Sequence, residues 1–210
     1  MRYEEYSYLY PPRPEAAIQP KSLDYYEKLG WVAQYKKNGT NTVIWISPDK
    51  KIILRNRHAT HHRAWQITKH LEDEIVRLFP DDGWYVFCAE IMHSKTPTIK
   101  DTLYIYDLVV WGSELLLGST FMERQKLLDS ILLTNVEAYS HYICDTQGKI
   151  WYPKLVKSNF RKVFDSIKEP KIDEGLVLKN PDGKLSLLLR PNNNNDWQVK
   201  CRHPHKNYNF

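Results

Sequence analysis

Residues 33–46 read AQYKKNGTNTVIWI and join two strand-like runs through a polar connection. The flanking runs are rich in β-branched and aromatic residues, which favour strands. Asn38-Gly39 is typical of a hairpin turn, but such a turn does not require the two lysines, Lys36 and Lys37, that come before it. Side chains alternate along a strand, so we expect these two lysines to point to opposite faces. A solvated hairpin tip and a polar site are both compatible with this stretch alone.

The composition is that of a globular protein and restricts the classes that it can belong to. The 210 residues suffice for one large domain or two small ones with a real core, and the net charge of +5 is compatible with an anionic partner. The three cysteines (Cys88, Cys144 and Cys201) form no C-x-x-C pair, so we expect neither disulfides nor a thiolate zinc site. No apolar run is long enough to span a bilayer and no signal core is present, so we expect a cytoplasmic protein without a membrane partner, in the host cytoplasm if the source is viral.

Periodicity predicts an α+β fold, with antiparallel sheets and interleaved helices. The proline-rich residues 1–24 are expected to form an extended lead-in that packs over the surface, ahead of one domain over residues 25–210. Strand-like runs occupy residues 31–36, 41–48, 51–57, 83–92, 102–111, 174–180, 184–191 and 197–203.

Three segments have helical spacing. Residues 63–79 carry an apolar stripe that Pro80 should end. Residues 119–132 open with Thr120 and Glu123, the pair that forms a capping box. Residues 160–168 carry a third apolar face.

Polar residues interrupt the apolar strands in a regular order. They are Lys36, Arg55 and Arg57, Glu90, Tyr106-Asp107, Glu174-Gly175, and Lys200 with Arg202. A charge within a buried strand costs free energy unless it is paired or the strand lines a polar cleft. Structural ion pairs could explain any one of these interruptions, but their number in separate strands favours one shared cleft.

These residues resemble the ordered motifs of the covalent nucleotidyltransferases, which are the ATP-dependent polynucleotide ligases and the mRNA-capping guanylyltransferases. The matching segments are KKNG (36–39), RNR (55–57), CAE (88–90), YD (106–107), EGLVLK (174–179) and KCR (200–202). The Gly-Thr-Asn after the lysine motif is most similar to phage-type RNA ligases of the double-strand-repair kind. The resemblance covers most of the chain and implies the ATP-grasp-like ligase adenylation fold. DNA ligases usually have Asp at the place of Asn38 and carry a C-terminal OB-fold, which we do not expect here because few residues follow Arg202.

The resemblance implies a chemistry for the charged residues. Lys36 is the nucleophile that attacks the α-phosphorus of ATP. A free lysine is protonated at neutral pH, so nearby cations, desolvation or a metal must favour the neutral amine. Lys200, Arg202 and a divalent cation, Mg²⁺ or Mn²⁺, would supply that positive field, and Glu174 would bind the metal.

The same resemblance implies the nucleotide contacts. Glu90 and Arg57 would hold ribose hydroxyls or a nucleic-acid phosphate. Arg55 has the same facing as Arg57, and we prefer Arg57 by its distance from Lys36. Tyr106 would stack on the base, although a core aromatic is also compatible with its place in the strand. Asn41 is expected in the cleft.

Two further assignments stay open. Gln34 stands where ligases often have a base-contacting glutamate, and its amide could accept from adenine or donate to guanine. The cluster His58, His61 and His62 lacks Cys, Asp or Glu partners at ligand spacing, so we favour a solvated helix entry, or contact with phosphate beside Arg63, over a metal site.

We therefore expect a monomeric ATP-dependent RNA ligase that joins nucleic acid with 5′-phosphate and 3′-hydroxyl ends, contacting it through Arg55, Arg57 and Arg63. The alternatives are a DNA ligase or end-adenylylating enzyme, a capping-type guanylyltransferase, and a catalytically silent nucleic-acid-binding relative.

Overall fold

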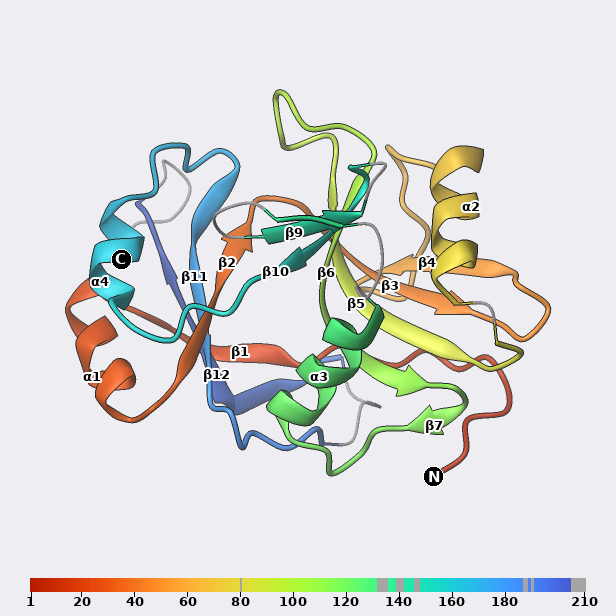
Figure 1. Cartoon of the computed structure of the whole chain (residues 1–210), viewed down its shortest axis with the longest axis horizontal. Helices are drawn as coiled ribbons and strands as arrows, with labels where there is room; N and C mark the ends of the chain where they lie inside the picture. Colours follow the sequence, from red (N-terminus) through yellow and green to blue (C-terminus); the bar gives the residue numbers. More distant parts are fainter. Residues whose placement is uncertain are drawn as a thin grey trace.

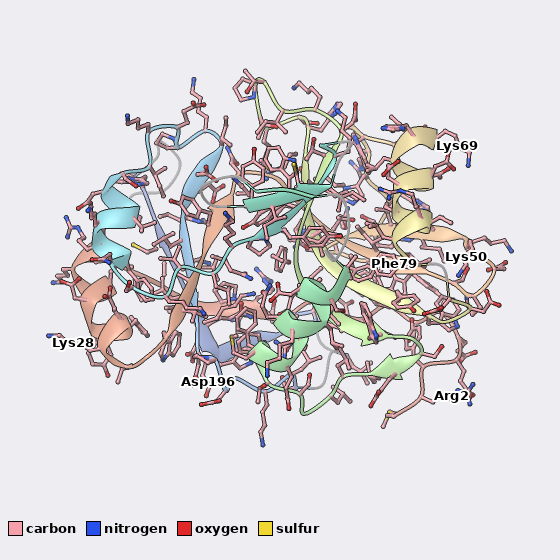
Figure 2. The ribbon with its side chains drawn as sticks, viewed as in Figure 1. Arg2, Lys28, Lys50, Lys69, Phe79 and Asp196 are labelled. Carbon is pink, nitrogen blue, oxygen red and sulfur yellow. The ribbon has the colours of Figure 1, made fainter. Side chains whose placement is uncertain are left out.

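The chain forms two β-sheets with helices packed against them (Figure 1). The computed structural model describes residues 1–79, 81–131, 136–138, 142–145, 148–186, 189 and 191–204, and the strands and helices below belong to these residues. Charged side chains such as Lys28, Lys69 and Asp196 lie at the periphery, whereas Phe79 lies inside, beside the larger sheet (Figure 2).

The larger sheet contains most of the central sequence. Its strands are β3 (Thr40–Ile46), β4 (Ile52–Asn56), β5 (Tyr85–Met92), β6 (Thr102–Trp111), β7 (Glu114–Leu115), β8 (Val136–Ala138), β9 (Tyr142–Asp145) and β10 (Ile150–Pro153). Their order is β4-β3-β5-β6-β10-β9-β8, with β7 paired to β6. Among these pairs only β10 and β6 run parallel.

The smaller sheet joins the two ends of the described chain. Its strands are β1 (Arg13–Ile18), β2 (Val32–Lys37), β11 (Asp173–Lys179) and β12 (Asn194–Arg202), in the order β1-β12-β11-β2. Strand β1 is an edge strand and runs parallel to β12, whereas the other pairs are antiparallel. The chain passes from this sheet to the larger one at Asn38-Gly39. A Cβ on Gly39 would lie 2.7 Å from Cβ of Glu90, so only glycine lets the two segments come this close.

Four helices pack against the two sheets in the described part of the chain, and α3 contacts both sheets. They are α1 (Leu23–Lys28), α2 (Lys69–Leu78), α3 (Phe121–Ile131) and α4 (Phe160–Asp165), and a short 3₁₀ turn (Pro20–Ser22) precedes α1. Helix α2 packs Leu71 and Ile75 against the larger sheet. Helices α1 and α4 cover the smaller sheet through Leu23 and Phe160.

Strand alternation gives each sheet two different faces. On β3, Ile44 and Ile46 face the α2 side, whereas Val43 and Trp45 pack on the opposite side with the N-terminal residues Tyr3 and Leu9. On the smaller sheet, Ala33, Leu176, Leu178 and Val199 face α1 and α4. Their neighbours along the strands therefore face away from these helices, toward the larger sheet.

Most predicted elements are confirmed, but the helix predicted over residues 63–79 is too long. Helix α2 starts only at Lys69, because Oγ1 of Thr68 accepts a hydrogen bond from the backbone N–H of Leu71 and caps the helix there. Upstream, the indole of Trp65 donates to Asp101, 2.8 Å away, and Ile67 packs on the core from a loop. The apolar spacing of residues 63–68 therefore reflects burial without helix formation; Pro80 lies outside the described residues.

Two strand assignments also differ from the prediction. Residues 13–18, expected to be part of an extended lead-in, form β1 and pair with β12. Within the predicted strand 184–191, Lys184 makes a single bridge to Thr120, Leu185 and Ser186 are outside any strand, and residues 187, 188 and 190 lie outside the described part. The predicted capping box of α3 is present: Oε2 of Glu123 accepts from the N–H of Thr120 at 2.7 Å.

Cys88, Cys144 and Cys201 are all buried, and none of the three forms a disulfide bond. Over the described residues, every helix is too short and too polar to cross a bilayer.

Glycine substitutions test the close contact between β11 and β12. Gly175 has φ of +148°, and a Cβ there would lie 2.1 Å from the carbonyl oxygen of Cys201. Gly175→Ala is therefore expected to lower the free energy of unfolding by at least about 3 kcal/mol. Gly30 has φ of +75° with no atom within 4 Å of such a Cβ, so Gly30→Ala should cost only about 1 kcal/mol. Urea unfolding followed by circular dichroism measures both, and equal losses would contradict the contact.

Candidate active site

A cavity of about 320 Å³ lies between the polar faces of the two sheets. The smaller sheet contributes alternate residues of β11 (Val177 and Lys179) and β12 (Gln198, Lys200 and Arg202), and four successive residues of β2, from Gln34 to Lys37. The larger sheet and the loop after β4 contribute Asn41, Arg57, Glu90, Tyr104 and Tyr106. Residues 10–14, at the start of β1, form a further wall.

An ion pair at the end of β2 defines the chemical centre of this cavity. Nζ of Lys36 lies 2.7 Å from Oε2 of Glu174, and Nε of Arg202 lies 3.1 Å from the same oxygen. The Lys36 side chain is only 15% exposed. The nucleophile predicted from the sequence is therefore a largely buried amine held between a carboxylate and a cationic side chain.

A β-bulge directs Glu174 toward Lys36. In the β2–β11 ladder, Asp173 pairs with Lys37 and Gly175 pairs with Lys36, so Glu174 is the extra residue between two successive pairs. A bulge bends the strand and redirects the side chain of the extra residue. The bulge therefore explains why a residue next to a regular ladder can reach the amine.

Lys37 lies on the other side of β2, as strand alternation predicts. Its Nζ is 2.6 Å from Oδ1 of Asp173 and lies over the rings of Tyr104, Tyr142 and Trp151, with centroids 5.2–5.5 Å away. Burial lowers the pKa of Lys37, against the opposing effect of Asp173. The two adjacent lysines thus pair with two adjacent carboxylates, Lys36 with Glu174 and Lys37 with Asp173.

Glu90 is the second carboxylate of the cavity. It lies opposite Asn41 in the β3–β5 ladder. Burial raises the pKa of Glu90 to about 7, although the positive charges of Lys36 and Lys95 oppose the rise and only Glu174 adds to it. A carboxyl group with this pKa can hold or release a proton near neutral pH.

Lys200 and Arg202 reach the cavity from the same face of β12. They are two residues apart, so the strand period places them side by side. Burial lowers the pKa of Lys200, and the nearby charges of Arg202, Lys36 and Arg13 lower it further. This concentration of positive charge suits a cavity for an anionic group such as phosphate.

The floor of the cavity is a polar network around β6. The hydroxyl group of Tyr106 accepts a hydrogen bond from the side-chain amide of Asn41 at 2.8 Å. Burial raises the pKa of the Tyr106 phenol well above its usual value. Next to it, the carboxylate of Asp107 accepts two hydrogen bonds from the buried Arg124, and Nζ of Lys179 lies 3.8 Å from it. Burial lowers the pKa of Lys179 to about 8.

Two buried polar atoms at the cavity have no hydrogen-bond partner in the described part of the chain. They are Oδ1 of Asn41 and Nε2 of Gln198, and both residues line the cavity. Buried polar groups are nearly always paired, so each of these atoms is available to a ligand.

The structure brings together most of the residues predicted from the sequence. Gln34, Lys36, Asn41, Arg57, Glu90, Tyr106, Lys200 and Arg202 line the cavity, and Glu174 pairs with Lys36. Of the two candidate arginines, Arg57 lines the cavity, whereas Arg55 donates to the carbonyl of Leu54 and contacts His61. Arg63 is exposed and borders a neighbouring groove with His58, His62 and His93.

Several residues of the cavity have no role that could be assigned from the sequence. Lys179 closes the EGLVLK segment, and its place at the end of that motif was the only signal for it. Arg13 lies in a proline-rich segment and enters the cavity only because β1 pairs with β12. Tyr104 alternates with Tyr106 along β6, lines the cavity and also packs in a core cluster.

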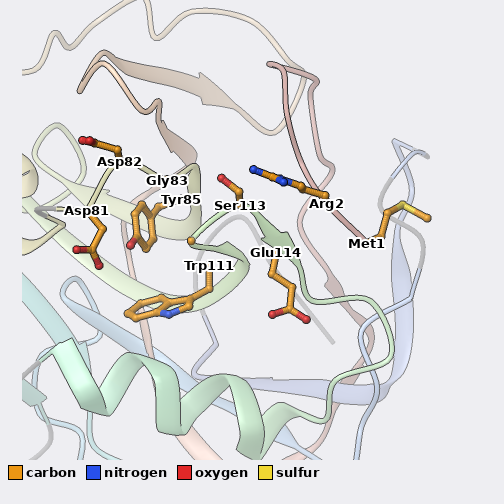
Figure 3. A pocket seen from close by; sticks show the side chains of 10 residues that line it. Met1, Arg2, Asp81, Asp82, Gly83, Tyr85, Trp111, Ser113 and Glu114 are labelled. Carbon is orange, nitrogen blue, oxygen red and sulfur yellow. The ribbon is translucent and has the colours of Figure 1, made fainter.

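A second cavity, of about 680 Å³, has a different chemistry. It lies near the N-terminus and is bordered by Arg2, by the acidic Asp81, Asp82 and Glu114, and by the rings of Tyr85 and Trp111 (Figure 3). Among its described lining residues there is no lysine. We therefore take the smaller cavity around Lys36 as the candidate active site.

Solved structures with a similar arrangement of elements include ligases. The ligase domain of M. tuberculosis LigD matches at a TM-score of 0.60 and 16% identity, over 93% of this chain and 59% of that one. A mycobacterial DNA ligase D complexed with ATP and MES matches at 0.55 and 16% identity, over 82% of this chain and 54% of that one. The ATP-dependent DNA ligase from bacteriophage T7, in complex with ATP, matches at 0.53 and 14% identity, over 92% and 68%.

The fold is therefore that of the nucleotidyltransferase domain of ATP-dependent polynucleotide ligases, as the resemblance of the motifs implied. The chain spans between half and three-fifths of the length of the two mycobacterial chains. No protein-family model matches the chain, and no curated protein matches its sequence.

The raised pKa of Glu90 predicts a pH-dependent stability. In the unfolded chain the pKa of the Glu90 carboxyl group is near its ordinary value of 4.5, whereas in the folded protein this pKa is about 7. The native state therefore loses stability as the pH rises from about 4.5 to 7. Glu90→Gln should unfold with nearly the same free energy as the wild type at pH 4.5 and be about 1–3 kcal/mol more stable at pH 8.

Urea unfolding at the two pH values measures this difference. Glu5→Gln, which changes an exposed glutamate remote from the cavity, is the matched control and should leave the difference near zero at both. A Glu90→Gln variant that is only as stable as the wild type at pH 8 would contradict the raised pKa of Glu90.

Proposed function

We propose that the chain is the nucleotidyltransferase domain of an ATP-dependent RNA ligase, in which Lys36 forms a covalent lysyl-AMP intermediate. The observation that carries the proposal is the partly buried Lys36–Glu174–Arg202 group at a cationic cavity. It places an amine, carboxylates and phosphate-binding cations in one cavity, and that cavity belongs to a ligase-like fold.

In the first step, Nζ of Lys36 attacks the α-phosphorus of ATP. The new P–N bond forms as the bond from the α-phosphorus to the bridging oxygen breaks, and pyrophosphate leaves. The amine must give up a proton, and Glu174, 2.7 Å from Nζ, is placed to accept it. Lys200 and Arg202 would stabilise the negative charge that develops on the phosphate oxygens.

The other cavity residues would hold the nucleoside. The ring of Tyr106 lines the cavity and offers a surface for base stacking, and the free Oδ1 of Asn41 offers a further contact. Glu90 and Arg57 would contact the ribose hydroxyls or a strand phosphate. Gln34, at the base of the cavity, would contact the edge of the base.

Mg²⁺ or Mn²⁺ fits the donor set of the cavity. Within the described residues no three metal-ligating side chains come together, so the protein would share the ion with the nucleotide. Mg²⁺ commonly uses one or two carboxylates, phosphate oxygens and waters, and Glu174 would be its protein ligand, with Glu90 nearby. When bound, the ion would neutralise phosphate charge.

In the later steps AMP would pass from Lys36 to a 5′-phosphate end, and a 3′-hydroxyl would then displace it to seal the strand. Each step is a displacement at phosphorus, so the same cations would serve all three. Arg57, at the mouth of the cavity, together with Arg55 and the exposed Arg63, would contact the strand. RNA as the substrate rests on the Gly39-Thr40-Asn41 sequence, which resembles the phage-type RNA ligases.

A DNA ligase is the second candidate. It is favoured by the fold comparison, because the structures that match with TM-scores of 0.53–0.60 include DNA ligases. The two candidates share the first step and differ in the sugar at the end that is sealed.

Substitution of Lys36 tests the covalent step. The purified wild type, incubated with ATP labelled at the α-phosphate and a divalent cation, is expected to retain label after denaturation. Lys36→Arg keeps the positive charge beside Glu174 but has no amine to form the phosphoramidate, so labelling should fall by at least about 100-fold. Lys51→Arg, at an exposed turn, is the control and should label like the wild type. Retention of label in Lys36→Arg would refute the assignment of the nucleophile.

Nicked duplexes test the choice of nucleic acid. Two duplexes of the same sequence would carry either a ribose or a deoxyribose at the 3′-hydroxyl side of the nick, with ATP and Mg²⁺ present. We expect at least about tenfold faster sealing of the ribose end if its 2′-hydroxyl is recognised, because one lost hydrogen bond in a binding site costs about 1.4 kcal/mol or more. Equal sealing rates would favour the DNA ligase.

A further inference from the structure

A row of three polar side chains leads from the base of the cavity to helix α3. Nε2 of Gln34 donates to Oε1 of Gln125 at 3.3 Å, and Nε2 of Gln125 donates to Oδ1 of Asp129 at 2.8 Å. Gln34 and Gln125 are both about 2% exposed, whereas Asp129 lies at the surface. Gln125 and Asp129 are four residues apart, so they share one face of the helix.

This row has a direction, because an ionised carboxylate only accepts hydrogen bonds. Asp129 therefore requires the NH₂ group of Gln125 to face it, and the oxygen of Gln125 is left to face Gln34. Because Oε1 of Gln125 can only accept, the NH₂ group of Gln34 must face it. The orientation of each amide thus follows from the charged end of the row.

A second acceptor fixes Gln34 in the same orientation. Nε2 of Gln34 also donates to the backbone carbonyl of Tyr106 at 3.3 Å. Both N–H groups of the amide are therefore used by the protein. Oε1 has no hydrogen-bond partner in the described part of the chain, and Gln34 lines the cavity, so this oxygen is the atom left for a ligand.

We propose that Gln125 and Asp129 are positioning residues that hold the Gln34 amide with its oxygen toward the nucleobase and thereby select ATP over GTP. This inference rests on the proposed function and goes further, because the residue type at position 34 alone allowed either base. Adenine presents an amino group that donates to this oxygen. Guanine presents an oxygen at the same ring position, and two facing acceptors would each stay unpaired.

The expected selectivity follows from the cost of an unpaired buried acceptor. The wild type should form its covalent nucleotide adduct with ATP about 10- to 100-fold more efficiently than with GTP, compared as rate over nucleotide concentration. Gln125→Met has a similar volume but removes one of the two acceptors of the Gln34 amide and leaves only the carbonyl of Tyr106, so the amide is held less firmly in this orientation. Its ATP-to-GTP ratio should fall by about fivefold or more.

Two further variants separate orientation from packing. Gln125→Glu keeps an acceptor toward Gln34 and should keep the wild-type ratio, whereas Asp129→Asn can both donate and accept and should lower it. Lys126→Gln, an exposed neighbour on the same helix, is the control and should leave the ratio unchanged. Thermal unfolding of each variant checks that the fold is kept, and affinities for AMP and GMP, measured by calorimetry, provide the same ratio without the covalent step.

These measurements distinguish a failure of the base-selection inference from a failure of the proposed ligase function. Adducts that form equally well from ATP and GTP in the wild type would overturn this inference and leave the ligase function standing. An unchanged ratio in Gln125→Met would overturn the role of the row. No adduct with either nucleotide would contradict the proposed function, and equal affinities for AMP and GMP would then overturn the inference independently.

Discussion

The ion pair between Lys36 and Glu174 is the interaction on which the cavity depends. A largely buried amine is tolerated only when a carboxylate compensates its charge, and the carboxylate in turn shares its oxygen with Arg202. Glu174 reaches Lys36 because the β11 ladder contains one extra residue, and Gly175 lets β11 come close to β12 directly after it. The backbone geometry of one strand therefore positions the central charges of the site.

Because side chains alternate along the strands, each sheet has an apolar face and a polar face, and the cavity lies between the two polar faces. On the smaller sheet, the apolar residues of β2, β11 and β12 face α1 and α4, and the polar residues between them face the larger sheet. The same period on β3 places Val43 in the core beside the N-terminal segment and Asn41 in the cavity. Where the two polar faces meet, charges that would be costly in either core neutralise one another.

Much of this arrangement could be predicted from sequence. The charged residues Lys36, Glu90 and Lys200 stand out because charges are rare inside apolar strands. The structure brings all three to one cavity. The segment of Arg13 was not recognised as a strand, because its prolines and short apolar stretch carry no alternation and its pairing partner lies far along the chain. The role of Gln125 could not be inferred, since a glutamine on a helix has no signal of its own until the fold brings it to Gln34.

Strand β1 borders the cavity and is an edge strand of the smaller sheet in the part of the chain that the structure describes. The N–H of Arg13 donates to the carbonyl of Asn193 across the sheet, so alternation turns the next backbone nitrogen, that of Pro14, toward the unpaired edge. Proline has no hydrogen there to give. At this position the edge therefore has no donor for a foreign strand, and such an interruption disfavours edge-to-edge aggregation at the strand that borders the cavity.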